Sequence, residues 1–233
     1  MIRVLHYGMG PRPGGIETYL RDLWRHADRE RYHFDYFYSD TGQEPYFADL
    51  LRAEGSDFFP ITARRENPLR NRRDLRHLLV PERFDILHFH CNTMSYAAPV
   101  RVALVAGLRV MVHSHNAGAQ RRLTRVLHRV NRSTIPWRRI TKLAVSEPAG
   151  AWMFGEAGTD VLAPNGIDVE RFAFDPAARA RVRAEFDLAD LAVVGHVGGF
   201  LPAKNHLFLL RAFALLATAR PDVALLLVGG GHS

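Results

Sequence analysis

Short apolar runs alternate along the chain with longer stretches in which apolar residues recur at helical spacing. The apolar runs predict strands at residues 2–7, 33–38, 84–89, 109–113, 142–145, 161–163, 192–197 and 223–228. The helical spacing predicts helices at residues 16–27, 44–53, 67–79, 94–106, 119–130, 176–186 and 206–217. Strands that alternate with helices are typical of an α/β fold with parallel sheets. Such sheets bind ligands beyond the carboxyl ends of their strands.

A turn-rich segment, APNGIDVERFAF at residues 163–174, interrupts this alternation. Asn-Gly marks a turn, and Asp168 is placed to cap the residues after it. We therefore expect one domain at residues 1–172 and a second at residues 173–233. A parallel strand at 223–228 that ends in glycines is expected to lead into another helix and strand. The sequence thus predicts that the second domain is incomplete.

Composition and charge narrow the class of protein. Hydrophobic residues make up 47% and charged residues 24%, which is typical of a globular protein. The formal charge of +7 favours anionic partners such as phosphates or an acidic membrane. The positive charge is uneven along the chain and is concentrated in two clusters of arginines. The first lies at residues 64, 65, 70, 72, 73 and 76, and the second at residues 121, 122, 125, 129, 132, 138 and 139. A simpler interpretation is that these arginines keep helix faces solvated.

Cysteine usage and hydropathy exclude several other classes. The single cysteine, Cys91, excludes a disulfide framework and a thiolate zinc cluster. No apolar run approaches the length of about 20 residues that a membrane span requires. The N-terminal sequence MIRVLHYGMG has no apolar signal-peptide core. We therefore expect a cytoplasmic protein.

A glycine-rich loop, Gly8 to Gly15, follows the first predicted strand and opens the first predicted helix. Glycines allow a ligand to approach the backbone closely, and free amides at a helix start attract anions. The spacing differs from the dinucleotide fingerprint GxGxxG, and two prolines remove amide donors. Asp40 is a weak substitute for the ribose-binding acid of that fingerprint. The alternative is an ordinary strand-to-helix turn without a ligand.

The strand at 109–113 ends in His113-Ser114-His115-Asn116. Strand alternation sends His113 and His115 to the same side. Two histidines with no evident third ligand make a poor metal site, so hydrogen bonding to a sugar or phosphate fits better. A structural role is about equally consistent with the pattern. His88 and His90, at the end of another strand, are weaker candidates.

A third segment, Gly198 to His206, precedes the last predicted helix, which we expect to begin near Asn205 as its N-cap. Lys204 beside the positive end of that helix is well placed to hold a diphosphate. The segment is not a Walker loop, because GxxxxGK[ST] is absent. The alternative is a solvated loop lysine.

Taken together, these segments resemble glycosyltransferase family 4, a group of GT-B enzymes, and most closely its capsule and exopolysaccharide branch. The resemblance covers nearly the whole chain in order. The segments that carry it are VLHYGMGPRPGGIETYL at 4–20, FDILHFH at 84–90, HSHN at 113–116, AVSE at 144–147, PNGID at 164–168 and HVGGFLPAKNHLFLL at 196–210. Each is weak alone, whereas their order and spacing are specific.

The resemblance implies a GT-B fold, with a complete N-terminal Rossmann-like domain on the acceptor side and the first part of a second, nucleotide-sugar-binding one. It implies a retaining transfer of a sugar from a UDP- or GDP-sugar to a polysaccharide, glycolipid or other acceptor in cell-surface glycan biosynthesis, with no cofactor and no metal. Expected partners are the nucleotide sugar, a sugar or lipid-linked acceptor, the anionic inner face of the cell membrane, and a separate chain that carries the missing part. Nucleic acid is not expected.

The resemblance also implies roles for individual residues. His113 or His115 would contact the transferred sugar, and Lys204 would bind the donor diphosphate. Gly14 and Gly15 would approach the same diphosphate. Three further residues would lie in loops or on the acceptor side, namely Glu17, Asn116 and Ser146.

The sequence departs from the family pattern in two ways. Gly199 stands where the family usually has an arginine that shares the diphosphate with the lysine, and losing such a contact costs about 1.5–3 kcal/mol. The glutamate-bearing donor motif of the family is absent before Ser233. A non-catalytic remnant, or one half of a split enzyme that binds only acceptor or partner, is therefore the alternative function. A nicotinamide-dependent oxidoreductase fits the motifs less well.

Overall fold

The computed structural model describes residues 1–188 and 190–230. The chain forms two compact units, Met1–Ile167 and Asp168–Ser233. The division lies slightly before the boundary that the sequence predicts between residues 172 and 173. Each unit is described by itself.

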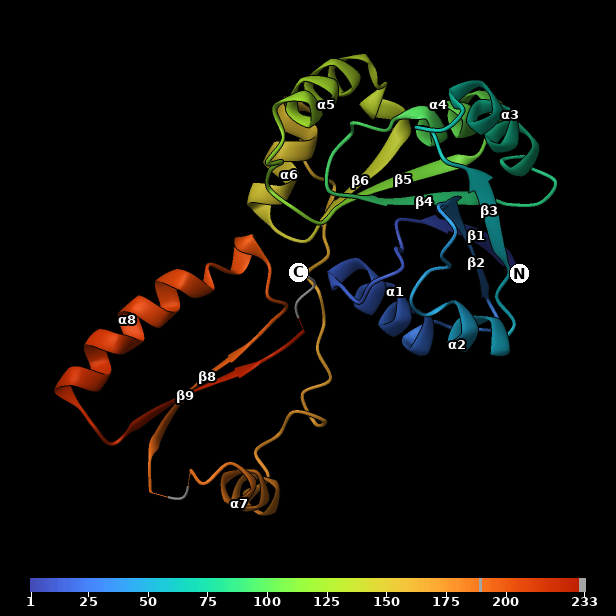
Figure 1. The fold of residues 1–233 in the computed structure, drawn as a ribbon. Coiled ribbons are helices and arrows are strands. Elements are labelled where there is room, and N and C mark those ends of the chain that lie inside the picture. The colour runs from blue at the N-terminus through green and yellow to red at the C-terminus, as the bar shows by residue number, and fades with distance from the viewer. Residues whose placement is uncertain (189, 231–233) are drawn as a thin grey trace. The chain divides into compact units, whose positions relative to one another are not determined.

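The first unit is built on a parallel sheet of seven strands (Figure 1). The strands are β1 (Ile2–Tyr7), β2 (Tyr32–Asp40), β3 (Phe58–Thr62), β4 (Ile86–Cys91), β5 (Arg109–Ser114), β6 (Ile140–Ala144) and β7 (Val161–Leu162). Their order is β3-β2-β1-β4-β5-β6-β7. This is the doubly wound order, and the chain changes direction across the sheet between β1 and β4. Ligands of such sheets bind at this switch point, beyond the carboxyl ends of the strands.

Helices cover both faces of the sheet, with α1 and α2 on one side and α3 to α6 on the other (Figure 1). They are α1 (Gly15–His26), α2 (Ala48–Ala53), α3 (Pro68–Leu78), α4 (Ala98–Ala106), α5 (Arg122–Thr134) and α6 (Glu147–Phe154). Short 3-10 turns lie at Trp137–Arg139 and Gly155–Ala157. The α/β fold that the alternating pattern predicts is confirmed.

Two clusters of buried apolar side chains hold these layers together. The larger packs α3, α4 and α6 on one face of the sheet, around residues such as Leu75, Leu104 and Met153. The smaller packs α1 and α2 on the other face, around Leu20 and Leu51. Both faces of the central strands are therefore buried, which explains their nearly continuous apolar runs.

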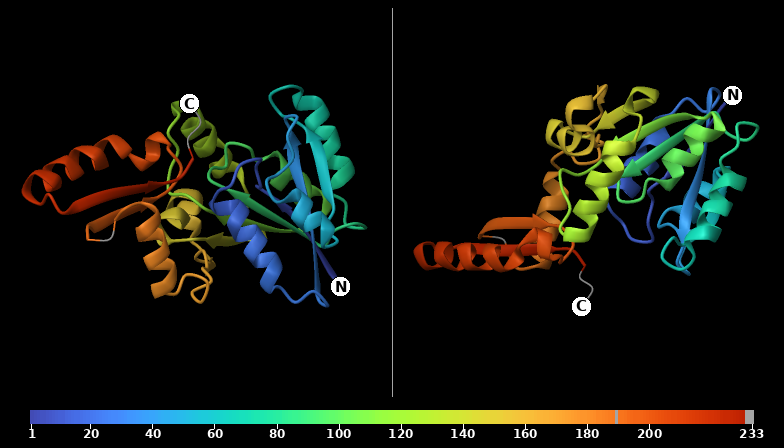
Figure 2. Two further views of the ribbon diagram at one scale, coloured as in Figure 1. Left: turned by 60° about the horizontal axis from the view of Figure 1, so that its bottom comes forward. Right: turned by 90° about the horizontal axis from the view of Figure 1, so that it is seen from above.

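The second unit contains two parallel strands, β8 (Ala192–Val197) and β9 (Val223–Val228), which pair directly (Figures 1 and 2). The helix α8 (His206–Ala219) connects them and contacts β9. A 3-10 turn at Pro202–Lys204 precedes α8, and α7 (Pro176–Glu185) precedes β8. The three elements β8, α8 and β9 form one strand-helix-strand motif.

Several predicted elements differ from the observed ones. β3 and α6 were not predicted, and α2 and α4 begin at Ala48 and Ala98, four residues later than expected. In the described part of the chain, no helix is long and apolar enough to cross a membrane.

Candidate functional site

The glycine-rich loop brings the carboxyl ends of β1 and β4 close together. Gly8 has φ of 131°, which L-residues with side chains rarely adopt. A Cβ at Gly8 would lie only 2.6 Å from the carbonyl oxygen of His90. Only glycine therefore allows the loop after β1 to pass this close to β4.

Glu17 holds the other end of this loop. Its side chain is buried in the first turn of α1, and its Oε1 accepts a 2.7 Å hydrogen bond from the backbone N–H of Gly10. Its Oε2 occupies the space that a Cβ at Gly14 would need, at 2.5 Å. Glu17 therefore lies in α1 rather than in the loop, and its carboxylate holds the loop in place. Gly15 begins α1, and a Cβ there would meet nothing nearer than the Asn165 side-chain nitrogen at 3.8 Å.

A cavity of about 370 Å³ opens at the switch point. The glycine loop forms one wall, and the segments that follow β2 and β4 form the others. Ser39, Thr41, Asn92 and Thr93 contribute polar side chains, and Tyr96 contributes an aromatic one. This mixture of hydroxyls, amides and a ring is suited to binding a sugar or another polar small molecule.

Five histidines gather beside this cavity, on the face of the sheet that α1 covers. We call them the histidine cluster: His6, His88, His90, His113 and His115. The strand register explains the cluster, because His6 pairs with His88 across β1 and β4, and His90 pairs with His113 across β4 and β5. His90 also lines the cavity. Sequence reasoning ranked His88 and His90 low and did not select His6.

A chain of hydrogen bonds runs through three of these rings. His6 Nδ1 lies 3.2 Å from His90 Nε2, and His90 Nδ1 lies 2.9 Å from His115 Nε2. Burial and, to a smaller extent, the neighbouring His113 lower the pKa of His6 and of His115 to about 3. Burial lowers the pKa of His113 to about 4, although a backbone contact at Ala163 partly offsets this. These imidazoles are therefore uncharged at neutral pH.

Two other predicted site residues lie near the same edge of the sheet. Asn116 follows His115 and is exposed, and its Oδ1 accepts a hydrogen bond from the N–H of Ala117. Ser146 is the N-cap of α6, and its Oγ accepts from the N–H of Ala149 at 3.3 Å. Asn116 thus lies at the surface beside the cluster, whereas Ser146 has a structural partner.

Lys204 and Gly199 both lie in the second unit, after β8. The stem of Lys204 runs beside the glycine pair, because a Cβ at Gly198 would lie 3.6 Å from Lys204 Cε. Asn205 is the N-cap residue of α8, as predicted, but it does not cap the helix through its side chain. Its φ is 48°, and its side chain makes no capping hydrogen bond. The amides that open α8 therefore lack a side-chain cap.

Comparison with known proteins identifies the family. The model of Glycosyltransferase Family 4 matches residues 13–171, which is more than half of the chain. The chain belongs to glycosyltransferase family 4. The resemblance drawn from the motifs is confirmed.

Individual relatives agree with this assignment. EpsF of Bacillus subtilis, which its name describes as a glycosyltransferase, is 31% identical over 98% of this chain. A GDP-mannose-dependent α-(1-6)-phosphatidylinositol monomannoside mannosyltransferase of Mycobacterium tuberculosis is 28% identical over 95% of it. The chain spans 62% of the length of EpsF and 58% of the mannosyltransferase.

A solved structure shows the same fold. Anabaena Alr3699/HepE, crystallised with UDP and glucose, superposes with a TM-score of 0.74 at 21% identity. The match covers 100% of this chain and 62% of HepE. The GT-B type of fold that the resemblance implies is confirmed.

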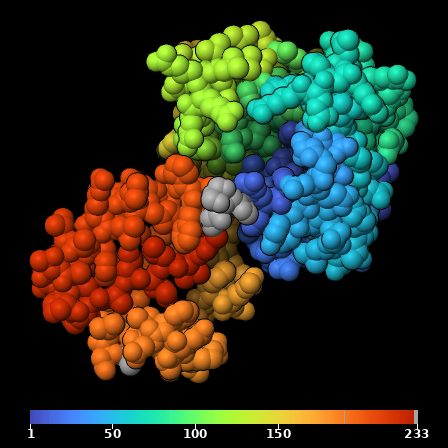
Figure 3. All heavy atoms as spheres, viewed as in Figure 1, coloured from blue at the N-terminus to red at the C-terminus, as the bar shows by residue number. Residues whose placement is uncertain are grey.

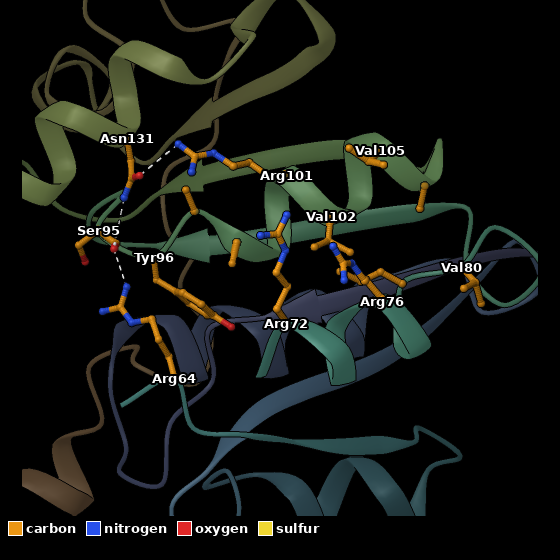
Figure 4. Close-up of a pocket in the computed structure, with 14 residues that line it drawn as sticks. Arg64, Arg72, Arg76, Val80, Ser95, Tyr96, Arg101, Val102, Val105 and Asn131 are labelled. Carbon is orange, nitrogen blue, oxygen red and sulfur yellow. Dashed lines mark hydrogen bonds between the residues drawn. The ribbon is translucent and has the colours of Figure 1, made fainter. Parts of the chain in front are cut away.

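This family 4 chain has a second cavity, of about 540 Å³, between α3 and α4 (Figure 4). Arginines surround its apolar floor, and Figure 4 shows Arg72 and Arg76 extending from α3 toward α4. Arg64 donates to the carbonyl oxygen of Ser95 at 2.6 Å, and Arg101 donates to Asn131 Oδ1 at 3.2 Å. The cavity therefore combines apolar surface with four guanidinium groups.

The neighbouring helix α5 carries an apolar stripe on its exposed side. Leu123, Val126, Leu127 and Val130 follow helical spacing, and Leu123 is 69% exposed. Arginines at positions 122, 125 and 129 lie beside the stripe. The opposite side of the helix faces the core through His128. Figure 3 shows the yellow-green atoms of this segment at the surface.

Proposed function

We propose that this family 4 chain takes part in transfer of a sugar from a UDP- or GDP-sugar to a saccharide or lipid-linked acceptor, with retention at the anomeric carbon. The observation that carries the proposal is the convergence of the glycine loop, the switch-point cavity and the histidine cluster at one sheet edge. HepE was crystallised with UDP-glucose, and the mannosyltransferase is named as GDP-mannose-dependent, which supports both donor classes. The second name also includes a phosphatidylinositol monomannoside, which supports a lipid-linked acceptor.

In this proposal, charge on the leaving nucleoside diphosphate is balanced by the protein without a metal. Lys204 supplies a cation, and the start of α8, which no side chain caps, supplies partial positive charge. Such groups act most strongly where charge develops in the transition state. In the first unit, Gly14 and Gly15 would let the start of α1 approach a phosphate group closely.

His113 or His115 would contact the transferred sugar, and His115 is the more exposed of the two. Because burial keeps both imidazoles uncharged near pH 7, they would exchange hydrogen bonds with hydroxyls rather than supply charge. Asn116 is exposed beside them and is available to either substrate. The cavity at the switch point would receive the acceptor.

Calorimetric titration with UDP-glucose and GDP-mannose tests donor binding. We expect heat with one of the two donors, and an affinity at least about tenfold lower in the Lys204→Ala variant, because a charge-assisted contact is lost. Arg211→Ala removes another exposed cation of the same unit and serves as the matched control. Absence of heat from folded protein with every nucleotide sugar tried would overturn the proposal.

We further propose that the first unit docks on anionic bilayers through α5 and the arginine-lined cavity. The apolar stripe of α5 would enter the interface, and arginines beside it would contact lipid phosphates. Each basic residue near an anionic surface contributes about 1 kcal/mol. Such docking would bring a lipid-linked acceptor within reach.

Flotation with phosphatidylglycerol vesicles tests this docking. We expect binding at low salt that weakens at high salt, and loss of binding when Leu123 and Val126 are both replaced by Gln. Leu50→Gln, at an exposed position of α2, is the control and should bind like the parent chain. If binding changes neither with salt nor in the variant with both replacements, this surface is excluded as the docking surface.

A further inference from the structure

We propose that the histidine cluster is a binding site for one divalent transition-metal ion of the zinc type, held by His90, His113 and His115. This inference goes beyond the proposed sugar transfer and does not depend on it. In the sequence, His113 and His115 at the end of one strand made a poor metal site, because no third ligand was evident. The fold adds the further imidazoles that a metal site needs.

The ligand atoms are already close to one another. One ring nitrogen from each of the three histidines lies within 4.8 Å of the others. Two nitrogens bound to a tetrahedral zinc at 2.0–2.1 Å are separated by roughly 3.3 Å. The bonded pair His90 Nδ1 and His115 Nε2, at 2.9 Å, would open slightly to admit the ion, and His113 would move closer. Small ring rotations complete this geometry.

Buried nitrogens without partners are a second, independent observation. Among the described residues, His115 Nδ1, His6 Nε2 and His88 Nε2 have no hydrogen-bond partner, and neither nitrogen of His113 makes a well-formed one. A buried polar atom left unpaired costs about 1–3 kcal/mol. An ion that ligates His113 would use a lone pair that the protein leaves unsatisfied.

The chemistry of the donors selects the class of ion. All three ligands are neutral imidazoles, which is the form that binds metals. Imidazole suits zinc, copper, nickel and cobalt, whereas magnesium and calcium prefer oxygen ligands. Cys91 lies on the same strand as His90 but one residue on, so its side chain points to the opposite face of the sheet. The site is therefore an imidazole site.

A second set of three, His6, His88 and His90, is less suitable. All three of its residues are fully buried, whereas His115 in the first set is partly exposed. Exposure gives the ion a route of entry and leaves room for a water as fourth ligand. An ion at His113 and His115 would occupy the side chains that we propose for sugar contact, so the two would compete.

Titration of the untagged chain of residues 1–233 with Co²⁺, after treatment with a chelator, tests the site. We expect one equivalent to bind with the visible absorption of tetrahedral cobalt, and Zn²⁺ to displace it. His113→Asn and His115→Asn should each weaken binding at least tenfold. His77→Asn removes an exposed histidine of α3 and should leave binding unchanged. Circular dichroism of each variant confirms folding.

The wild-type chain provides a readout that needs no variant. Zn²⁺ should raise its unfolding temperature, because an ion that binds only the folded state stabilises it, and Mg²⁺ at equal concentration should not. Several results would overturn the proposal. These are no cobalt binding at millimolar concentration, equal effects of Mg²⁺ and Zn²⁺, or binding that survives His115→Asn but is lost in His6→Asn.

Discussion

At the scale of single residues, the main feature of this protein is a group of uncharged imidazoles inside its first unit. His6, His90 and His115 are linked by ring-to-ring hydrogen bonds, and each bond requires one donor and one acceptor. A proton added to His90, the middle ring, would leave two donors facing each other at one of its two links. Burial and mutual repulsion therefore act together to keep the group neutral.

This neutrality predicts that the free energy of unfolding falls as the pH falls from about 6.5 toward 4. Unfolded histidines bind a proton near pH 6.5, whereas His6 and His115 do so only near pH 3, and His113 near pH 4. Between these values the unfolded chain binds more protons, so acid favours unfolding. Well below pH 6.5, each such histidine contributes a slope of about 1.4 kcal/mol per pH unit. Urea unfolding between pH 7.5 and 5.0, with chelator present, measures this slope.

Variants assign the slope to the cluster. His113→Gln should make the free energy of unfolding less dependent on pH, because one buried titrating group is removed. His77→Asn, at an exposed position, should leave the dependence unchanged. A free energy of unfolding that is constant between pH 7.5 and 5.0 would contradict the prediction.

The sequence identified part of this group and could not identify the rest, for a physical reason. Alternation along one strand was enough to place His113 and His115 on the same side. Which strands lie beside one another depends on sheet order, which no local pattern contains. Since β1 and β4 are neighbours although residues 8–85 separate them in the chain, His6 and His88 meet only in the folded sheet. The glycine loop, in contrast, could be recognised from the sequence, because Gly8 adopts a backbone conformation that favours glycine.

At the scale of elements, the two that the sequence did not predict both contain residues that discourage their structure. β3 includes Pro60, which lacks an N–H, but β3 is an edge strand and pairs only with β2. α6 includes Pro148 and Gly150, yet Pro148 lies in the first turn, where its missing N–H costs little. Gly150 lets the helix approach Thr159 closely. Tertiary packing thus overrides local propensity in both cases.

The cap of α6 gives a prediction at this scale. Ser146→Ala should lower the free energy of unfolding by about 1 kcal/mol, because the N–H of Ala149 loses its acceptor. Ser146→Asp should retain most of the stability, since aspartate also caps helices. Urea unfolding measures both variants, and Ser133→Ala on exposed α5 is the control. Equal stability of the alanine variant and the parent would show that the cap contributes nothing, which would favour the loop or acceptor role for Ser146.

At the scale of the whole molecule, the two units differ in how much apolar surface they bury. Both core clusters lie entirely within the first unit. In the second, among the residues that the structure describes, only Leu188 belongs to the buried apolar set, and neither α7 nor α8 contains a buried residue. Leu207, Phe208 and Leu215 are 67–77% exposed. Stability from apolar burial is therefore concentrated in residues 1–167.

This difference predicts that a fragment of residues 1–167 folds alone and unfolds cooperatively, whereas residues 168–233 alone do not. The fragment keeps the seven-stranded sheet, both clusters and the histidine cluster, so its free energy of unfolding should show the same dependence on pH. Small units with little buried surface rarely offset their conformational entropy. Thermal and urea unfolding of the two fragments, followed by circular dichroism, measure this. If residues 168–233 alone unfold cooperatively, the buried clusters do not determine where the stability lies. The same conclusion follows if residues 1–167 alone show no cooperative unfolding.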